Sequence, residues 1–221
     1  GRLGVVRLVG LEQEERVGAV MREAVGSAEL VAEEVRVPRR DDGVDGQEAG
    51  RSVVGVEAVP LPRVVTEDHG EWLRVEMPVR PNGTEGWIRA SDVTRTIIDT
   101  HVEIDLSDRT LTAYAGDTVI TTTKVVVGAA DTPTPTGRLY VTDYEEKYSG
   151  SAYGPWILPL SGYSQVMDEF SGGVPVIAMH GTNRPELIGT AASNGCIRMP
   201  DAVIEQLHAS LPFGTPVDIR E

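Results

Sequence analysis

A single cysteine is the residue of this sequence best suited to chemistry. Cys196 lies in the stretch SNGCIRM, residues 193–199, and no other thiol occurs in the 221 residues. A free thiol has a pKa of about 8.5 and is mostly protonated at pH 7, so it needs a base to become a nucleophile. His180 precedes it by the length of one loop. An imidazole can accept the thiol proton and later return it to a leaving group, which makes Cys196 and His180 the candidate nucleophile and base.

The other three histidines are in less suitable positions. His69 lies in a polar hairpin of a different expected domain, His101 begins an expected strand, and His208 lies on an expected helix. One cysteine and one histidine at this distance are more often structural residues. The residues around the thiol therefore have to decide between a structural and a catalytic interpretation.

Those neighbouring residues favour chemistry. Gly195 allows close backbone approach to a substrate or a strained φ, and the amides of Gly195 and Cys196 are candidates for an oxyanion hole. Arg198 shares a face with Cys196 on an extended segment, where it either holds a carboxylate or supports the loop. Ser193 is a turn former or a substrate contact. A buried inert cysteine would not need the polar approach that Ser193 and Asn194 provide.

The elements that must position these residues are mostly strands. Residues 101–128 alternate apolar and polar side chains across two turn signals, and the connector TPTPTG is rigid and non-helical because proline fixes φ. The run VPVIAMH predicts a buried strand that ends at His180, and GTPVDI predicts a closing strand. One helix is expected after the cysteine, with Asp201 as its N-cap. Its expected buried stripe is Val203, Ile204, Leu207 and Leu211.

The first half of the chain predicts a smaller β domain. Residues 51–97 contain short strands separated by turns, including an Asn82–Gly83 hairpin signal, and favour a small barrel. Residues 1–50 form a segment of uncertain, short α/β character that ends in a linker. Its expected elements are a strand in GVVRLVG, a helix from Val17, a second strand over 28–37 and the linker over 38–50.

Composition excludes several partners. The formal charge is −14, so the chain repels nucleic-acid phosphates and anionic lipid. One cysteine excludes an internal disulfide and a thiolate zinc cluster. There is no apolar run of membrane-spanning length, and the start at Gly1 leaves room for a signal peptide or anchor outside this chain. The chain has only two lysines, which we interpret as codon bias, and we expect an actinobacterial source.

The motifs PTPTG, IAMHGT and SNGCIRM, in that order, resemble the L,D-transpeptidase or YkuD-fold family. That family's signature is a histidine followed by Ser/Thr-His-Gly-Cys-x-Arg. The resemblance covers residues 98–221 and implies a β-sandwich catalytic domain with a few helices. Most relatives have histidine at the position of Asn194. Because asparagine cannot accept a proton near neutral pH, any base must be His180 alone.

The resemblance also implies roles for individual residues. Cys196 is the nucleophile and His180 its base, Gly195 belongs to the oxyanion turn, and Arg198 is the family arginine. The further candidates for oxyanion or substrate binding are Ser193, Asn194, Gly181 and Tyr163. The segment WLRVEMPVRPNGTEGWIRASDV resembles the bacterial SH3-like domains that precede wall-active catalytic domains.

The activity implied is cross-linking of peptidoglycan stem peptides outside the cell, in the wall or periplasm. Cys196 attacks the carbonyl of an L,D bond and releases D-alanine, and a second stem amine resolves the thioester. No metal or organic cofactor is expected, and carbapenem β-lactams are expected covalent inhibitors. Two alternatives stay open: an L,D-carboxypeptidase that uses water as acceptor, and a non-catalytic wall-binding protein.

Overall fold

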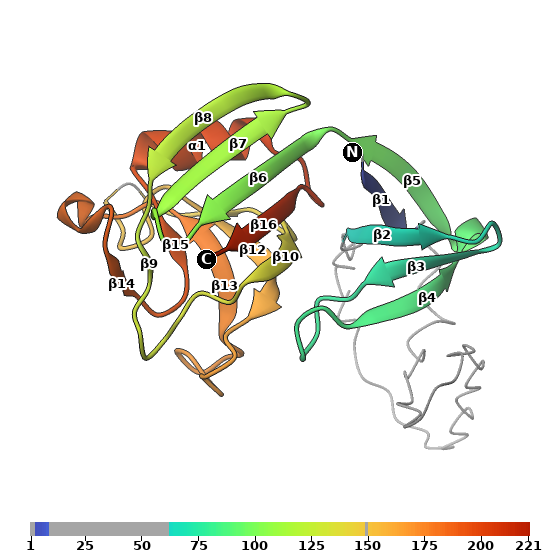
Figure 1. Ribbon diagram of the computed structural model, residues 1–221, viewed down its shortest axis with the longest axis horizontal. Coiled ribbons are helices and arrows are strands. Elements are labelled where there is room, and N and C mark those ends of the chain that lie inside the picture. Colours follow the sequence, from blue (N-terminus) through green and yellow to red (C-terminus); the bar gives the residue numbers. More distant parts are fainter. Residues whose placement is uncertain (1–2, 9–61, 149) are drawn as a thin grey trace, which may run out of the picture.

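The computed structural model describes residues 3–8, 62–148 and 150–221, which form two β units. Figure 1 shows the units side by side, joined where β5 (Val93–Ile98) runs almost directly into β6 (Thr100–Asp105). The expected helix from Val17, the second strand over 28–37 and the linker over 38–50 lie outside the described residues.

The first unit is one antiparallel sheet with strand order β4-β3-β2-β1-β5. In β3 the side chains alternate, with Leu73 and Val75 fully buried between partly exposed neighbours, as one face of a sheet requires. A single 3-10 turn, Ala90–Asp92, links β4 to β5. The first four strands are β1 (Leu3–Leu8), β2 (Arg63–Asp68), β3 (Trp72–Glu76) and β4 (Glu85–Arg89).

The strand predicted in GVVRLVG is confirmed as β1. It pairs with both β2 and β5, so it belongs to the same sheet as residues 63–98. The SH3-like barrel and a domain boundary at residue 51 stay predictions. The hairpin predicted at Asn82–Gly83 is present, with Gly83 in the left-handed region at φ 79° and a connection that spans residues 77–84.

The second unit contains two larger sheets. One has the order β10-β16-β6-β7-β8, in which β6, β7 and β8 are successive antiparallel neighbours and β16 runs parallel to β6. The alternation across residues 101–128 therefore predicted these three strands correctly. The bounds not yet given are β7 (Thr110–Ala115), β8 (Thr118–Lys124), β10 (Gly137–Tyr140) and β16 (Pro216–Arg220).

The other large sheet has the order β11-β12-β13-β15, with β15 parallel to β13. A two-stranded pair, β14 with β9, lies beside it. The strands are β9 (Val127–Gly128), β11 (Glu145–Glu146), β12 (Trp156–Tyr163), β13 (Val176–His180), β14 (Ala191–Ser193) and β15 (Ile197–Arg198). The buried strand that was expected to end at His180 is confirmed as β13.

The core of the second unit lies between its two large sheets and the helix α1 (Asp201–Ser210). Aliphatic side chains from both sheets dominate it, each worth about 1.5–3 kcal/mol when fully buried. Completely buried members include Val102, Ile104, Leu111, Leu158, Met179 and Ile197. The prediction of a mainly β fold is confirmed. In the described ranges no helix is long and apolar enough to cross a bilayer.

The predicted buried stripe of helix α1 is confirmed, but its predicted N-cap is not. Ile204, Leu207 and Leu211 are buried in the core, and Val203 packs partly against it. Asp201 is the first helical residue rather than the N-cap, which is Pro200. The N-cap prediction was wrong because the carboxylate of Asp201 accepts from the Thr182 amide, just after β13, instead of from the helix's own amides.

The two units share an apolar contact around Tyr140. Its side chain is fully buried against Val64 of β2 and Ile98 of β5. Its hydroxyl donates to the main-chain oxygen of Glu76, at 3.2 Å. Tyr140 of β10, in the second unit, therefore completes a small apolar cluster with residues of the first unit.

Glu76 carries an unusual carboxyl group at this junction. Burial raises its pKa to about 7; Arg138 lowers the pKa and Glu85 and Asp218 raise it. Among the described residues, its Oε2 is enclosed without a hydrogen-bond partner. The folded protein therefore binds this proton more tightly than the unfolded chain does. The free energy of unfolding must then fall as pH rises from about 4.5 to about 7.

We expect Glu76→Gln to raise the free energy of unfolding at pH 8 and to change it little at pH 5. The gain should be about 1 kcal/mol, because partial exposure screens the carboxylate. Urea unfolding at the two pH values measures it, with Glu71→Gln, at an exposed site, as the control. An equal effect at both pH values would contradict the burial argument.

Candidate active site

The candidate site is built on the parallel pairing of β13 with β15. Its register sets Met179 beside Ile197 and His180 beside Arg198. Neighbouring residues in register point to the same face of a sheet, and residues two apart along a strand do so as well. Cys196 therefore comes to the same face as Arg198 and next to the end of the histidine strand.

A pocket of about 150 Å³ opens at this place. Four of the candidate residues line it: Cys196, His180, Asn194 and Arg198. The six other lining residues come from loops at residues 152–153, 170 and 182–184. They are Ala152, Tyr153, Phe170, Thr182, Asn183 and Arg184.

His180 is held as a neutral imidazole. Only 2% of it is exposed, and its Nδ1 lies 2.7 Å from the main-chain oxygen of Gly181. A carbonyl oxygen only accepts, so Nδ1 carries the proton and Nε2 keeps its lone pair for another partner. Burial lowers the pKa of His180 to about 4; the Gly181 hydrogen bond partly offsets this, and Arg198 adds to it. The rings of Tyr153 and His180 pack in a T-shaped arrangement, with centroids 5.0 Å apart.

Cys196 is partly accessible, as a nucleophile must be. The surrounding protein still excludes enough water to raise the pKa of its thiol, although the main chain of Ala178 and the charge of Arg198 act in the opposite direction. The Sγ atom lies 3.9 Å from the Val176 main-chain oxygen. A neutral thiol and a neutral imidazole therefore line the same pocket. Contacts in unliganded sites are often long and tighten when substrate binds.

The turn before the cysteine is organised by Ser193. Its hydroxyl accepts from the Gly195 amide at 3.1 Å and donates to the Cys196 main-chain oxygen at 2.6 Å. Gly195 adopts a φ of 107°, which an L side chain rarely takes. Ser193 is 1% exposed and lies behind the pocket. Because the Gly195 amide already has an acceptor, Gly195 shapes the turn in this state rather than presenting its amide to a substrate.

The connector TPTPTG supports the same turn, a function that sequence reasoning missed. The Thr134 hydroxyl donates to the Gly195 oxygen at 2.8 Å and accepts from the Gly128 amide at 2.9 Å. The Thr132 hydroxyl donates to the Ser193 oxygen at 3.0 Å. The proline pattern indicated a rigid segment, but nothing local indicated which distant carbonyls its hydroxyls would bind.

Asp201 holds the segment that follows His180. Its Oδ1 accepts from the Thr182 amide at 2.9 Å. A methyl group added at Gly181 would meet that same oxygen at 2.4 Å and the Cα of Gly154 at 2.9 Å. The loop that carries Tyr153 is thus packed directly against the backbone that orients the imidazole.

Tyr163 lies outside the pocket lining. Its hydroxyl donates to the Pro78 main-chain oxygen of the first unit at 2.7 Å, and its backbone pairs with Asn82. No signal in the sequence separated Tyr163 from Tyr153, which does line the pocket.

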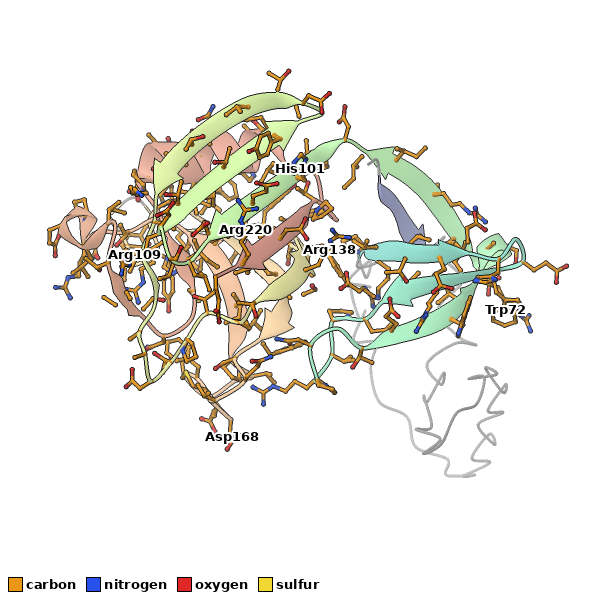
Figure 2. All side chains as sticks on the ribbon, in the orientation of Figure 1. Trp72, His101, Arg109, Arg138, Asp168 and Arg220 are labelled. Atoms are coloured by element: carbon orange, nitrogen blue, oxygen red, sulfur yellow. The ribbon has the colours of Figure 1, made fainter. Side chains whose placement is uncertain are left out.

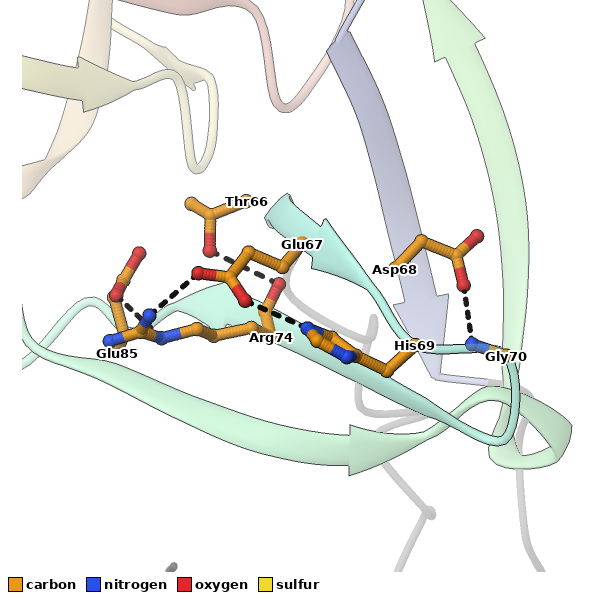
Figure 3. A network of polar contacts seen from close by, with 7 residues as sticks. All are labelled: Thr66, Glu67, Asp68, His69, Gly70, Arg74 and Glu85. Atoms are coloured by element: carbon orange, nitrogen blue, oxygen red, sulfur yellow. Dashed lines mark hydrogen bonds and ion pairs between the residues drawn. The ribbon is translucent and has the colours of Figure 1, made fainter.

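The other histidines have local contacts. They do not line the pocket, so His180 is the imidazole available to Cys196 there. In the described part of the chain, no group of three His, Cys, Asp or Glu side chains is arranged to hold a metal ion. His69 binds Glu67 at 2.8 Å (Figure 3). His101, which Figure 2 labels, stacks on Tyr114 with ring centroids 4.5 Å apart, and His208 stacks on Trp156 with centroids 3.5 Å apart.

A model of the L,D-transpeptidase catalytic domain, YkuD, matches residues 99–219, more than half of the chain. The chain belongs to this family. YkuD of Bacillus subtilis, whose name marks it as a candidate L,D-transpeptidase, is 33% identical over 54% of this chain and 65% of its own length. A YkuD protein of Bacillus licheniformis is 32% identical over 53% and 64%. The chain thus spans slightly less than two thirds of these relatives.

Two of the similar solved structures come from Enterococcus faecium. A cysteine-to-serine mutant of its L,D-transpeptidase is 27% identical, covers 55% of this chain and 50% of that one, and has a TM-score of 0.43. The catalytic domain of the E. faecium enzyme acylated by ertapenem is 25% identical, covers 57% of this chain and 99% of that one, and has a TM-score of 0.42.

The lowered pKa of His180 predicts an unusually acid-tolerant reaction of Cys196. For a histidine with the ordinary pKa of about 6.5, the unprotonated fraction falls about tenfold by pH 5.5. A histidine with a pKa of about 4 stays almost fully unprotonated at that pH. We expect acylation by an activated ester to change by less than about twofold between pH 7 and 5.5 and to fall near pH 4. Intact-protein mass spectrometry measures the rates, with His208→Gln as control. A tenfold loss by pH 5.5 would show an ordinary imidazole.

The close packing around Gly181 predicts a steric cost for one methyl group. Gly181→Ala should lower the free energy of unfolding by about 1–3 kcal/mol, as overpacking of a buried site does, and should slow acylation by displacing the Asp201 contact. Gly173→Ala is the matched control, because its added methyl group would meet only one atom, at 3.9 Å. Urea unfolding of both variants checks this, and equal stabilities would refute the clash.

Proposed function

We propose that this protein is a peptidoglycan L,D-transpeptidase in which Cys196 forms a thioester with a donor stem peptide. The observation that carries the proposal is the β13–β15 register, which brings His180 beside the strand that follows Cys196 in a chain of the L,D-transpeptidase family. A neutral imidazole whose Nδ1 is held by a carbonyl oxygen and a partly accessible thiol in the same pocket are the groups that acyl transfer needs.

The reaction begins when Nε2 of His180 takes the thiol proton and Sγ of Cys196 attacks the carbonyl of the L,D bond. The tetrahedral oxyanion is stabilised by the Cys196 amide. His180 then gives its proton to the departing D-alanine amine, and a thioester is left on Sγ. An acceptor stem amine attacks the thioester, His180 takes a proton from that amine, and the proton returns to Sγ as the new amide forms.

Arg198 and its neighbours orient the donor peptide. The Nε of Arg198 is buried and has no hydrogen-bond partner among the described residues. A guanidinium beside the thiol suits a substrate carboxylate and also favours the negative charge that develops on sulfur and oxygen. Asn194 lines the pocket and supplies amide donors, whereas Ser193 and Gly195 act through the turn.

The proposed setting follows from the substrate. Peptidoglycan lies outside the cytoplasmic membrane, so the protein would act in the wall or periplasm after export. Carbapenem β-lactams are proposed inhibitors because opening of the strained ring by Sγ gives an acyl-enzyme that resembles the thioester. The proposed reaction uses only side chains and main-chain groups of this chain, and the lack of a cofactor requirement stays a prediction.

The test uses the whole chain, a tetrapeptide stem as donor and a second stem as acceptor. We expect a thioester adduct on the wild type, and a loss of acyl transfer by Cys196→Ala on the order of 10⁴-fold or more. Cys196→Ser should also lose transfer, and urea unfolding should show that both variants fold. A covalent adduct on Cys196→Ala would contradict the assignment.

The products separate the remaining alternatives. A cross-linked dimer supports transpeptidation, whereas a shortened stem without a cross-link would identify a carboxypeptidase. Failure of the folded wild type to form any adduct, together with binding to isolated wall, would identify a wall-binding protein.

A further inference from the structure

The connection between β3 and β4, residues 77–84, makes specific contacts with the end of β12 in the other unit. The Asn82 side chain pairs with both main-chain groups of Tyr163: Nδ2 donates to the oxygen and Oδ1 accepts from the amide, each at 2.9 Å. This pairing uses the two functions of a side-chain amide as a neighbouring strand would use its backbone. It fixes the point at which β12 ends.

Arg80 holds the residues that follow. Its Nη2 donates to the main-chain oxygens of Ser164 at 3.2 Å and Met167 at 2.8 Å. Its guanidinium also lies 5.7 Å from the centre of the Tyr163 ring, whose hydroxyl donates back to Pro78. Charge-assisted bonds from one side chain to two carbonyls constrain the course of the chain after Tyr163.

The segment held in this way is the loop over residues 164–175, which joins β12 to β13. At its far part, Phe170 and Gly173 form two main-chain hydrogen bonds, of 2.9 and 3.1 Å, and Phe170 lines the pocket. The loop then enters β13 at Val176, whose main-chain oxygen faces Sγ of Cys196. Figure 2 labels Asp168, which lies in this loop.

The loop has little apolar burial of its own. Val166, Phe170 and Val174 are 40% to 59% exposed, Met167 is partly buried, and Pro175 at the end of the loop is buried. A segment with few buried contacts opens at low free-energy cost unless hydrogen bonds restrain it. Its first residues are restrained by Arg80, by the Ser164 amide, which donates to the Pro175 oxygen at 2.9 Å, and by the Ser164 hydroxyl, which accepts from the Val166 and Met167 amides.

We infer that residues 77–84 of the first unit are a positioning element for the substrate pocket. Asn82 and Arg80 fix the loop over 164–175 and thereby the wall that Phe170 presents to the donor peptide. Both are positioning residues, because neither lines the pocket. The effect on substrate rests on the proposed function, whereas the effect on the loop does not.

The loop is tested by amide hydrogen exchange of the full chain. We expect exchange in residues 164–175 to become about tenfold faster in Asn82→Ala and Arg80→Ala, since each variant loses two hydrogen bonds. Arg95→Ala is the matched control. It removes an arginine of the same unit whose partners, Asp68 and Gly70, lie within that unit. If both Asn82→Ala and Arg80→Ala fold and the exchange of residues 164–175 is unchanged in both, the inference is overturned.

The pocket is tested with two reagents on the same proteins. A stem peptide needs the Phe170 wall, whereas iodoacetamide needs only the thiol. We expect Asn82→Ala and Arg80→Ala to raise KM for the peptide several-fold and to change kcat less. The rate of alkylation by iodoacetamide should be the same in these variants as in Arg95→Ala. If exchange becomes faster but KM and kcat for the peptide are unchanged, the donor peptide does not contact the part of the pocket formed by Phe170, and that part of the inference fails.

The two proposals fail differently. If the wild type is not acylated by the peptide, the proposed function fails, and the exchange measurement still decides whether the first unit holds the loop. If the wild type is acylated and the variants match it in both measurements, the positioning role fails alone.

Discussion

The parallel pairing of β13 with β15 is the constraint on which the rest of the site depends. Parallel neighbours cannot be joined by a tight turn, so the chain must leave the end of β13 and return to run in the same direction. The return segment contains the 3-10 turn Pro185–Leu187, the short strand β14 and the turn at Ser193. This return segment supplies four polar residues to the pocket lining: Thr182, Asn183, Arg184 and Asn194. One register thus determines where imidazole, thiol and guanidinium meet.

The same pairing sets the electrostatics. Burial lowers the pKa of His180, and the charge of Arg198 lowers it further. Burial also raises the pKa of the Cys196 thiol, against the opposing effect of Arg198. An imidazolium–thiolate pair is therefore disfavoured before substrate arrives. In the proposed reaction, proton transfer is coupled to attack on a carbonyl, and the negative charge moves from sulfur to an oxyanion that the main chain and Arg198 can stabilise. A thiol kept neutral at rest is also a poorer target for oxidation, because the thiolate is the reactive form.

The supports of the site come from widely separated parts of the chain. Threonine hydroxyls of the TPTPTG connector bind the carbonyls of Ser193 and Gly195 in the turn before Cys196, and the first residue of α1 binds the backbone after His180. The first unit adds contacts through its 77–84 connection and through the shared core at Tyr140. A pocket built from such contacts is sensitive to changes at positions that do not line it.

Sequence alone was sufficient for features that neighbouring residues determine. Alternation predicted β6, β7 and β8, an apolar run predicted β13, and a helical stripe predicted the buried face of α1. Residue types and neighbours also marked Cys196, His180 and Arg198 as candidates for nucleophile, base and anion-binding group; all three line one pocket, and their roles stay proposals. Each of these inferences needs only a short window of the chain.

Tertiary structure decided what depends on register between distant segments. The carboxylate of Asp201, a local cap by its position in the sequence, binds Thr182 instead. The Gly195 amide is taken by Ser193, and Tyr163 faces the first unit while Tyr153 and Phe170 reach the pocket. The strand β1 joins a sheet whose other members lie more than fifty residues away. A hydrogen-bonding side chain satisfies whichever partner the fold brings within about 3 Å, and no local pattern specifies that partner.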